Sequence, residues 1–280
     1  MNYSLKIYII CVKILIMPEL PEVETIVRQL KKLVGKRIVK LEILDSQVVK
    51  NNVQEGLDRK ITDVSRRGKS ILIHLDNETF LSIHLRMTGH FHYVQNNDQT
   101  YKKYLACIFY FDNNHFLTHN SIRRFGTVSL LTKDKLDAEF KNLGIEPLSD
   151  DFTSIYFIKL MKKYPASPIK NKLLDQHLIA GIGNIYAQEA LYHAGIHPER
   201  KIGDISNHKL TLLYQSIKKI LLLAIENNGT TVQNYANIDG KGNFQNLLAV
   251  YNQKYCPKKH LLKKIKQAGR GTYYCPKCQT

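Results

Sequence analysis

The protein has 280 residues, of which 44% are hydrophobic, and its 41 Lys and Arg residues against 24 Asp and Glu residues give a formal net charge of +17. The apolar content is sufficient for a folded core and argues against disorder, and the length suits one large domain or two ordinary ones. The charge favours a polyanionic partner such as nucleic acid, although a solvated basic surface would give the same balance. Residues 240–280 contain nine Lys or Arg residues and no acidic residue, which strengthens the nucleic-acid interpretation.

The first sixteen residues differ from the rest of the chain. They are apolar but interrupted by Lys6 and Lys13, too short to span a bilayer, and without a small-residue cleavage site. A weak signal peptide, a membrane-surface helix and a true translation start at Met17 are all compatible with this segment. We prefer the third interpretation, in which residues 1–16 are not part of the mature protein and the protein has no membrane partner.

The segment after Pro21 predicts one amphipathic helix, because apolar residues recur at helical spacing up to Leu33 and Gly35 follows. Short β-rich segments separated by polar turns come next and predict a β-sandwich or barrel. The predicted strands are Ile38–Ile43, Ser70–Leu75, Phe80–Leu85, Ala106–Phe111, His115–His119 and Gly126–Leu131.

The pattern changes at Gly144–Asp151, where proline, serine and two aspartates indicate a linker. Helical periodicity follows, with apolar residues from Leu213 to Ala224 at helix spacing before Asn228 and Gly229 end the element. The predicted layout is an N-terminal helix, a β-sandwich, a linker, a helical domain and a basic, Cys-rich tail.

The cysteines indicate a reduced protein with a metal knuckle. An odd, unevenly spaced set of five is a poor disulfide framework, and Cys256, Cys275 and Cys278 lie in the last 25 residues. Cys275 and Cys278 have the spacing of half a zinc site.

Six sequence blocks, in this order, carry a family resemblance. They are MPELPEVET at 17–25, RRGKSILI at 66–73, HLRMTGHF at 84–91, RRFG at 123–126, LLDQHLIAGIGNIYAQEALYHAGIHP at 173–198 and GRGTYYCPKCQ at 269–279. Together they make residues 17–280 resemble the formamidopyrimidine-DNA glycosylase family. The resemblance implies an α+β multidomain fold: an N-terminal helix plus β-sandwich domain (17–145), a helix–two-turn–helix domain (146–245) and a zinc-finger hairpin (246–280).

The resemblance implies that Pro18 is the nucleophile. A mid-chain proline nitrogen is an unreactive amide, but removal of Met17 would leave a secondary amine that can attack a sugar C1′ and form an iminium Schiff base. An α-amino group has a pKa of about 7.7–8.0, so part of it is unprotonated near neutrality. A lone proline of this kind would more often begin a helix, but Pro21 already does so.

Two acid–base roles and one elimination role also follow from the matching positions. Glu19 matches the family's proton donor, although an acid here could also favour a helix N-terminus, as Glu22 does. Lys69 matches a lysine that contacts a phosphate and donates a proton during β-elimination. Arg270 matches an arginine that contacts phosphate and is assigned to δ-elimination. Arg66 and Arg67 are generic phosphate-binding candidates.

Three residues match those that fill the gap left by the extruded nucleotide: Met87, Arg123 and Phe125. An enzyme that acts on a base must take it out of the stack, and apolar wedges with an arginine offset that cost. A core Met and a core Phe are the alternative.

Further DNA contacts are implied for Tyr104, which stands where a histidine is expected, for Asn184 and for Lys170. Pro165 stands where the family has a basic residue. The glycines of GIGNIYA at 181–187 would let the backbone approach a phosphate. The segment from Gly229 to Thr231 resembles the start of a loop that encloses the damaged base.

The tail departs from the family's pattern, because Lys259 stands where the second cysteine of the first knuckle is expected. His260 could replace it, so that Cys256, His260, Cys275 and Cys278 would hold one structural zinc ion. A metal-free or weakly metallated hairpin is the alternative.

The resemblance implies a monomeric, bacterial-type cytoplasmic enzyme of base excision repair. It would be a bifunctional DNA glycosylase and AP lyase that acts on double-stranded DNA with oxidised purines or abasic sites, through a Schiff base and β,δ-elimination. The rivals are an endonuclease VIII-type glycosylase for oxidised pyrimidines, a non-catalytic damaged-DNA binder with the extension retained, and a general basic zinc-ribbon protein.

Overall fold

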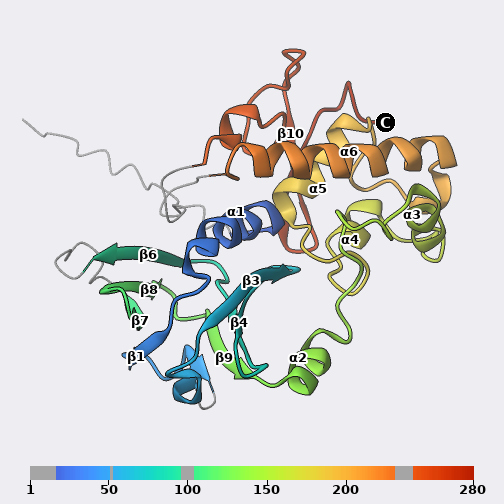
Figure 1. The fold of residues 1–280 in the computed structure, drawn as a ribbon. Helices are drawn as coiled ribbons and strands as arrows, with labels where there is room; N and C mark the ends of the chain where they lie inside the picture. The colour runs from blue at the N-terminus through green and yellow to red at the C-terminus, as the bar shows by residue number, and fades with distance from the viewer. Residues whose placement is uncertain (1–16, 51–52, 96–103, 231–241) are drawn as a thin grey trace, which may run out of the picture.

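The computed structural model describes residues 17–50, 53–95, 104–230 and 242–280, and it has a β-sandwich part and a helical part (Figure 1). The interpretations of residues 1–16 and of Thr231 lie outside the described residues. The α+β architecture agrees with the fold expected from the sequence. Sandwich and helical part each have their own hydrophobic core, and the first helix packs into both.

Helix α1 (Leu20–Leu30) lies at the boundary between the two parts and joins their cores (Figure 1). Its first residue, Leu20, is buried in the core of the helical part, whereas Val23 and Ile26 are buried in the core of the sandwich. Glu19 caps the helix through a reciprocal capping box with Glu22. The helix predicted after Pro21 is therefore confirmed, and a short 3-10 turn, Lys31–Leu33, completes it.

Two sheets form the sandwich. The four-stranded sheet is antiparallel and has the order β1 (Ile38–Ile43), β7 (Leu105–Phe111), β8 (His115–Ser121) and β6 (Gly89–Gln95). The five-stranded sheet has the order β2 (Val49–Lys50), β9 (Thr127–Leu131), β5 (Phe80–His84), β4 (Ser70–Leu75) and β3 (Ile61–Arg67), with β2 and β9 parallel. A 3-10 turn, Val53–Gly56, follows β2.

The six strands predicted from short β-rich segments between polar turns are confirmed, each within two residues of its observed bounds. Two longer strands, β3 and β6, were missed. In β3 a register shift between Ile61 and Asp63 places Ile61 and Val64 both in the core, three residues apart, so the strand lacks the alternation that would have revealed it.

The helical part follows the predicted linker. Its helices are α3 (Ser154–Met161), α4 (Ile169–Leu173), α5 (Asn184–His193) and α6 (Asn207–Glu226), preceded by α2 (Lys133–Phe140) against the sandwich. The linker pairs with the segment before α5: the N–H of Gly144 donates to Gln176 O at 2.8 Å, and Ile145 bridges Ile179. This pairing fixes where the turn ahead of α5 lies.

The last element is the hairpin β10 (Lys263–Gln267) and β11 (Arg270–Tyr274), which packs on α5. A 3-10 turn, Phe244–Leu247, precedes it. The buried carboxylate of Glu189 on α5 accepts the backbone N–H groups of Ala249, Val250 and Tyr251 at 2.7–3.0 Å. One charged side chain thereby anchors the segment that leads into the hairpin.

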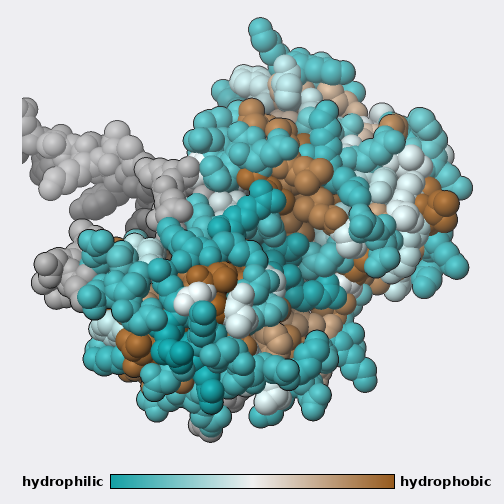
Figure 2. Space-filling model, viewed as in Figure 1, coloured by the Kyte–Doolittle hydropathy of each residue, from teal (hydrophilic) through white to brown (hydrophobic). Residues whose placement is uncertain are grey.

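The surface seen from the side of Figure 1 is mostly hydrophilic, with a few separate hydrophobic patches (Figure 2). None of the helices in the described ranges combines the length and apolar content needed to cross a membrane.

Candidate active site

A cavity of about 380 Å³ opens where the β3–β4 and β5–β6 turns of the sandwich meet the turn before α5 and the tip of the hairpin. Its wall contains four cationic side chains, Arg67, Lys69, Arg86 and Arg270, and also Met17, the residue before Pro18. Three of the four residues assigned to catalysis therefore line this cavity or adjoin a residue that does. The fourth, Glu19, lies directly behind the wall.

Glu19 is 4% exposed, and its carboxylate is held at the N-terminus of α5. The backbone N–H of Ile185 donates to Oε1 at 2.9 Å and that of Tyr186 donates to Oε2 at 3.3 Å. These are unpaired amides of a helix start, where the helix dipole also favours a negative charge. Pro18, the preceding residue, is buried at the same junction.

Burial raises the pKa of Glu19 to about 7, with the charge of Glu22 adding to the rise and that of Lys69 opposing it. Burial also lowers the pKa of Lys69, which Glu19 partly offsets and Arg270 reinforces. The Lys69 ammonium donates to Ile182 O at 3.2 Å. A carboxyl group that is half protonated near neutrality is suited to donate a proton.

The two glycines before α5, Gly181 and Gly183, pack closely against the start of α1. A Cβ on Gly183 would lie 2.2 Å from Cδ of Glu19, and a Cβ on Gly181, which has φ +85°, would lie 2.7 Å from Leu20. The N–H of Leu20 also donates to Gly181 O at 3.1 Å. These glycines therefore allow the start of α1 to pack against the turn before α5, and the phosphate approach expected for their backbone stays a prediction.

Glu22 is more than a favourable charge at a helix start. Its buried Oε1 accepts the Tyr186 hydroxyl and both the backbone N–H and the hydroxyl of Thr230, each of the latter at 2.8 Å. Its Oε2 accepts the N–H of Glu19 at 2.9 Å. This carboxylate therefore connects the proton-donor position to Gly229 and Thr230, the start of the segment expected to enclose the damaged base.

Arg66 and Arg67 do not face outward as free phosphate ligands. Arg66 pairs with Glu24 at 3.1 Å and Glu146 at 2.8 Å, and Arg67 pairs with Glu146 at 3.1 Å. The N–H of Gly68 donates to the same Glu146 carboxylate at 2.6 Å. The two arginines instead clamp the linker to the turn that carries Lys69, which corrects the sequence interpretation.

Lys170 and Asn184 belong to one network under the hairpin. Lys170 is fully buried, and its ammonium donates to Asn184 Oδ1 and to the Thr272 hydroxyl, both at 2.8 Å. Burial lowers the pKa of Lys170 to about 8, with Arg270 lowering it further. The Asn184 amide donates to Gly271 O at 3.1 Å. The network fixes the residue next to Arg270, so Lys170 acts inside the protein and not at its surface.

The three residues expected to fill the gap left by the extruded nucleotide come together on two adjacent turns of the sandwich. Arg123 Nη1 lies 3.3 Å from Met87 Sδ, and its guanidinium lies 4.8 Å from the ring centre of Phe125. Phe125 is 54% exposed, so the alternative of a core phenylalanine is wrong. Tyr104 lies beside them: it is 49% exposed, and its carbonyl accepts the N–H of Ser121, where the Arg123 turn begins.

His84 is a cavity residue that the sequence analysis missed. Its Nδ1 accepts the backbone N–H of Arg86 at 3.1 Å, and burial lowers its pKa to about 3. The ring is therefore neutral with its proton on Nε2, which makes it a fixed donor. The only signal in the sequence was its place as the first residue of the HLRMTGHF block.

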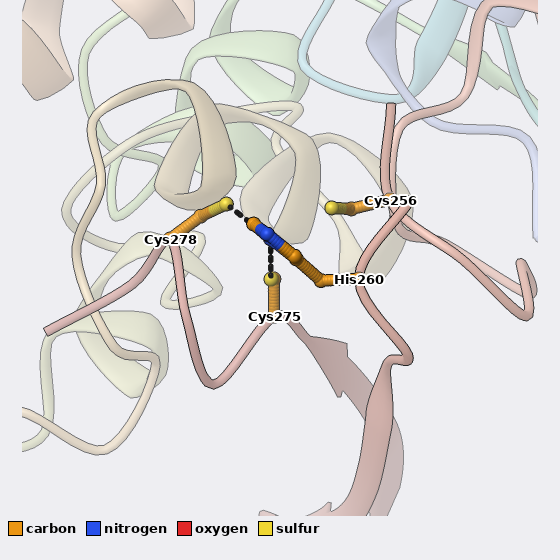
Figure 3. Close-up of side chains that lie close together, drawn as sticks. All are labelled: Cys256, His260, Cys275 and Cys278. Atoms are coloured by element: carbon orange, nitrogen blue, oxygen red, sulfur yellow. Dashed lines mark hydrogen bonds between the residues drawn. The ribbon is translucent and has the colours of Figure 1, made fainter. Parts of the chain in front are cut away.

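The candidate metal ligands converge at the base of the hairpin (Figure 3). One ligand atom each from Cys256, His260, Cys275 and Cys278 lies within 4.8 Å of every other. His260 Nδ1 is 3.3 Å from Cys278 Sγ and 3.6 Å from Cys275 Sγ. Three thiols and one imidazole at such separations fit a tetrahedral zinc ion, whereas Lys259, at φ +61°, contributes no ligand.

Three family models match this chain in sequence order. The Formamidopyrimidine-DNA glycosylase N-terminal domain matches residues 17–128, the Formamidopyrimidine-DNA glycosylase H2TH domain matches residues 143–236, and the Zinc finger found in FPG and IleRS matches residues 259–280. The presence of this zinc finger agrees with the cluster of four convergent ligands.

Similar proteins span almost the whole chain. The Formamidopyrimidine-DNA glycosylase of Pelotomaculum thermopropionicum is 42% identical over 275 residues, and that of Streptococcus pneumoniae is 38% identical over 274; both alignments cover 94% of this chain and 99% of the relative. A mutant of the Lactococcus lactis FPG in complex with Fapy-dG-containing DNA has a TM-score of 0.88 at 35% identity, and the match covers 94% of this chain and 100% of that one. The chain belongs to the formamidopyrimidine-DNA glycosylase family.

Proposed function

We propose that this protein is a bifunctional DNA glycosylase and AP lyase of base excision repair that removes oxidised purines. The observation that carries the proposal is the buried Glu19 carboxyl, held by the amides of α5 next to Pro18 and behind a cavity lined by Lys69 and Arg270. The Lactococcus lactis enzyme of the same family, which binds Fapy-dG-containing DNA, supports the purine substrate.

The proposed chemistry begins with the Pro18 nitrogen attacking C1′ of the damaged nucleotide. The C1′–N bond to the base breaks, its electron pair leaves with the base, and Glu19 supplies the proton that the leaving group needs. The attacking nitrogen loses its N–H proton, and the C1′–O4′ bond then breaks with its electron pair leaving on O4′, which takes up a proton. The nitrogen lone pair thereby forms the C1′=N bond of an iminium. This iminium acidifies C2′–H, and loss of the C2′ proton breaks the C3′–O bond, whose electron pair leaves with the phosphate. Loss of the C4′ proton from the unsaturated iminium then breaks the C5′–O bond in the same way, so phosphate is left at both ends. We place Lys69 and Arg270 at these phosphates.

This chemistry requires Pro18 to be the first residue, because its nitrogen is otherwise an amide. We therefore infer that the active form lacks everything before Pro18, and the match of the N-terminal family model from residue 17 supports this inference. Reduction with borohydride on an 8-oxoguanine duplex tests it. We expect a covalent adduct with the chain that begins at Pro18, and none with that chain when its amino terminus is chemically blocked or with the 280-residue chain.

A covalent adduct formed by the 280-residue chain while its N-terminus stays intact by mass would overturn the assignment of Pro18. Specific binding of a lesion duplex with no adduct from any form would leave the non-catalytic binder as the function. Faster excision of thymine glycol than of 8-oxoguanine opposite cytosine would favour the endonuclease VIII-type alternative.

We propose domain limits of 17–145, 146–245 and 246–280, supported by the linker pairing at Gly144–Ile145 and by the order of the family models. We assign Cys256, His260, Cys275 and Cys278 as the ligands of one structural zinc, which would hold the base of the hairpin together and so place Arg270. Because one chain supplies every wall of the cavity, we propose that the enzyme acts as a monomer, and its bacterial relatives support a cytoplasmic location.

A further inference from the structure

We propose that Arg86 is a phosphate-binding residue for the damaged strand, contacting a phosphate within one nucleotide of the lesion. The inference rests on the proposed function and adds a specific contact to it. Four features carry it: the fixed turn that presents Arg86, its unpaired guanidinium, the cationic cavity it lines, and its position beside the wedge.

The β5–β6 turn holds Arg86 in place from both sides. Leu85 is 1% exposed and anchors the turn in the sandwich core. Gly89 packs so closely on Leu85 that a Cβ would lie 2.4 Å from the Leu85 carbonyl oxygen, and the Gly89 N–H donates to that oxygen at 2.9 Å. Between them Arg86 has φ +53°, a left-handed conformation that arginine adopts at a cost. The side chain that this turn carries is exposed and lines the cavity.

Arg86 differs from Arg67 and Lys69 in that its side chain has no partner in the described residues. Arg67 is neutralised by Glu146, and Lys69 donates to the Ile182 carbonyl. The exposed guanidinium of Arg86 forms no ion pair or hydrogen bond with any residue in the described ranges. It is instead close enough to His84 to help lower the pKa of that ring, behind the larger effect of burial. Four cationic side chains line the cavity against one acidic side chain, Glu139, so an unpaired arginine there favours a bound anion.

The neighbours of Arg86 indicate which anion this is. On one side His84 presents its Nε2 proton, and Lys69 and Arg270 line the same cavity. On the other side Met87 is the next residue, in contact with Arg123. A side chain between the proposed chemistry and the proposed wedge lies where the backbone of the damaged strand must pass, and a guanidinium matches two oxygens of one phosphate.

The test measures binding to a duplex carrying an uncleavable tetrahydrofuran abasic analogue, which needs no Schiff base, so its failure is separate from failure of the proposed chemistry. Arg86→Gln should reduce the slope of log K against log salt by about 0.9, the loss of one phosphate contact. Between 50 and 200 mM salt that difference amounts to about 3.5-fold in affinity. Arg86→Lys should restore the slope.

The matched control is Arg59→Gln. Arg59 is exposed and lies just before β3, at the end of that strand opposite Arg67 and the cavity, so the slope should stay unchanged. Duplexes in which one phosphate at a time is replaced by a neutral methylphosphonate then locate the contact. At one phosphate beside the lesion, the replacement should weaken binding by the unaltered protein but not binding by Arg86→Gln. Equal slopes for Arg86→Gln and Arg59→Gln, or equal methylphosphonate effects with and without Arg86 at every phosphate, would overturn the proposal.

Discussion

Glu19 shows how one residue combines the demands of folding and chemistry. Burial destabilises the ionised form of Glu19, and the charge of Lys69 and the α5 amides offset part of that effect. The pKa of Glu19 is therefore raised to about 7. Since the raised pKa favours the protonated form, that form predominates below about pH 7 and is lost as the pH rises through it. The same carboxyl would be fully ionised at neutral pH in water.

We therefore expect the single-turnover rate of base excision to decline on the alkaline side of neutrality, as Glu19 loses its proton. Glu19→Gln should lower the rate by about 10²–10⁴-fold, the usual contribution of a general acid. Glu24→Gln is the control on the same helix, since Glu24 pairs with Arg28 and Arg66 away from the α5 amides. A rate that keeps rising to pH 9 in the unaltered enzyme would contradict this role for Glu19.

At the scale of elements, the junction of α1 with the start of α5 depends on Gly183. Gly183→Ala would place a methyl group 2.2 Å from Cδ of Glu19, so the carboxylate must leave the α5 amides. We expect excision to fall to within about tenfold of the Glu19→Gln rate because the same proton donor is lost. Gly56→Ala, which meets only side-chain methyl groups at 3.3 Å or more, is the control for a general loss of stability. Full activity in Gly183→Ala would show that the junction tolerates displacement.

The zinc finger is a second element whose ligand set can be tested. We expect one zinc per chain by atomic spectroscopy, retained in His260→Cys and lost or greatly weakened in His260→Ala, because three ligands leave an open site. With cobalt in place of zinc, His260→Cys should strengthen the thiolate charge-transfer absorption relative to the unaltered protein. Lys259→Ala is the control and should keep the metal. Full zinc content in His260→Ala would exclude His260 from the set.

For the whole molecule, the relative placement of sandwich and helical part depends on Glu146. The side chain of Arg66 is 9% exposed and pairs with both Glu146 and Glu24. Removal of the Glu146 charge would leave this largely buried guanidinium paired with Glu24 alone. We expect Glu146→Gln to lower the free energy of unfolding by about 3 kcal/mol in urea titrations at pH 7. Asp137→Asn, in a pair whose side chains are both more than 60% exposed, should cost no more than about 0.5 kcal/mol. If Glu146→Gln and Asp137→Asn lowered the free energy of unfolding equally, the ion pairs of Glu146 would contribute no more to stability than an exposed pair.

The effect of Glu146 also has a defined pH dependence. Burial acts to raise its pKa, but the charges and hydrogen bonds of Arg66, Arg67 and Gly68 outweigh burial and the net pKa is lowered. A lowered pKa means that the contribution is present above the unfolded-state value and is lost as the pH falls through the folded-state value. The difference between Glu146→Gln and the unaltered protein should therefore shrink in acid.

Local pattern determined much of this protein. The period of apolar residues located α1, β-rich segments between polar turns located six strands, and the spacing of Cys275 and Cys278 indicated the metal site. These features depend on the pattern of residues within a short segment, so they can be predicted from residues that are close together in the sequence. Strand β3 was not predicted, because the bulge between Ile61 and Asp63 interrupts the alternation of buried and exposed residues.

Only the tertiary structure decided which distant residues meet. Glu19 and Ile185 are 166 positions apart, and no local periodicity encodes their hydrogen bond. The same holds for Glu22 with Thr230 and for Glu146 with the two arginines, whose charges in sequence look like generic DNA ligands. The sequence determined the chemical groups available to this enzyme, and the path of the chain determined their burial, partners and pKa values, because these depend on the groups that folding brings around them.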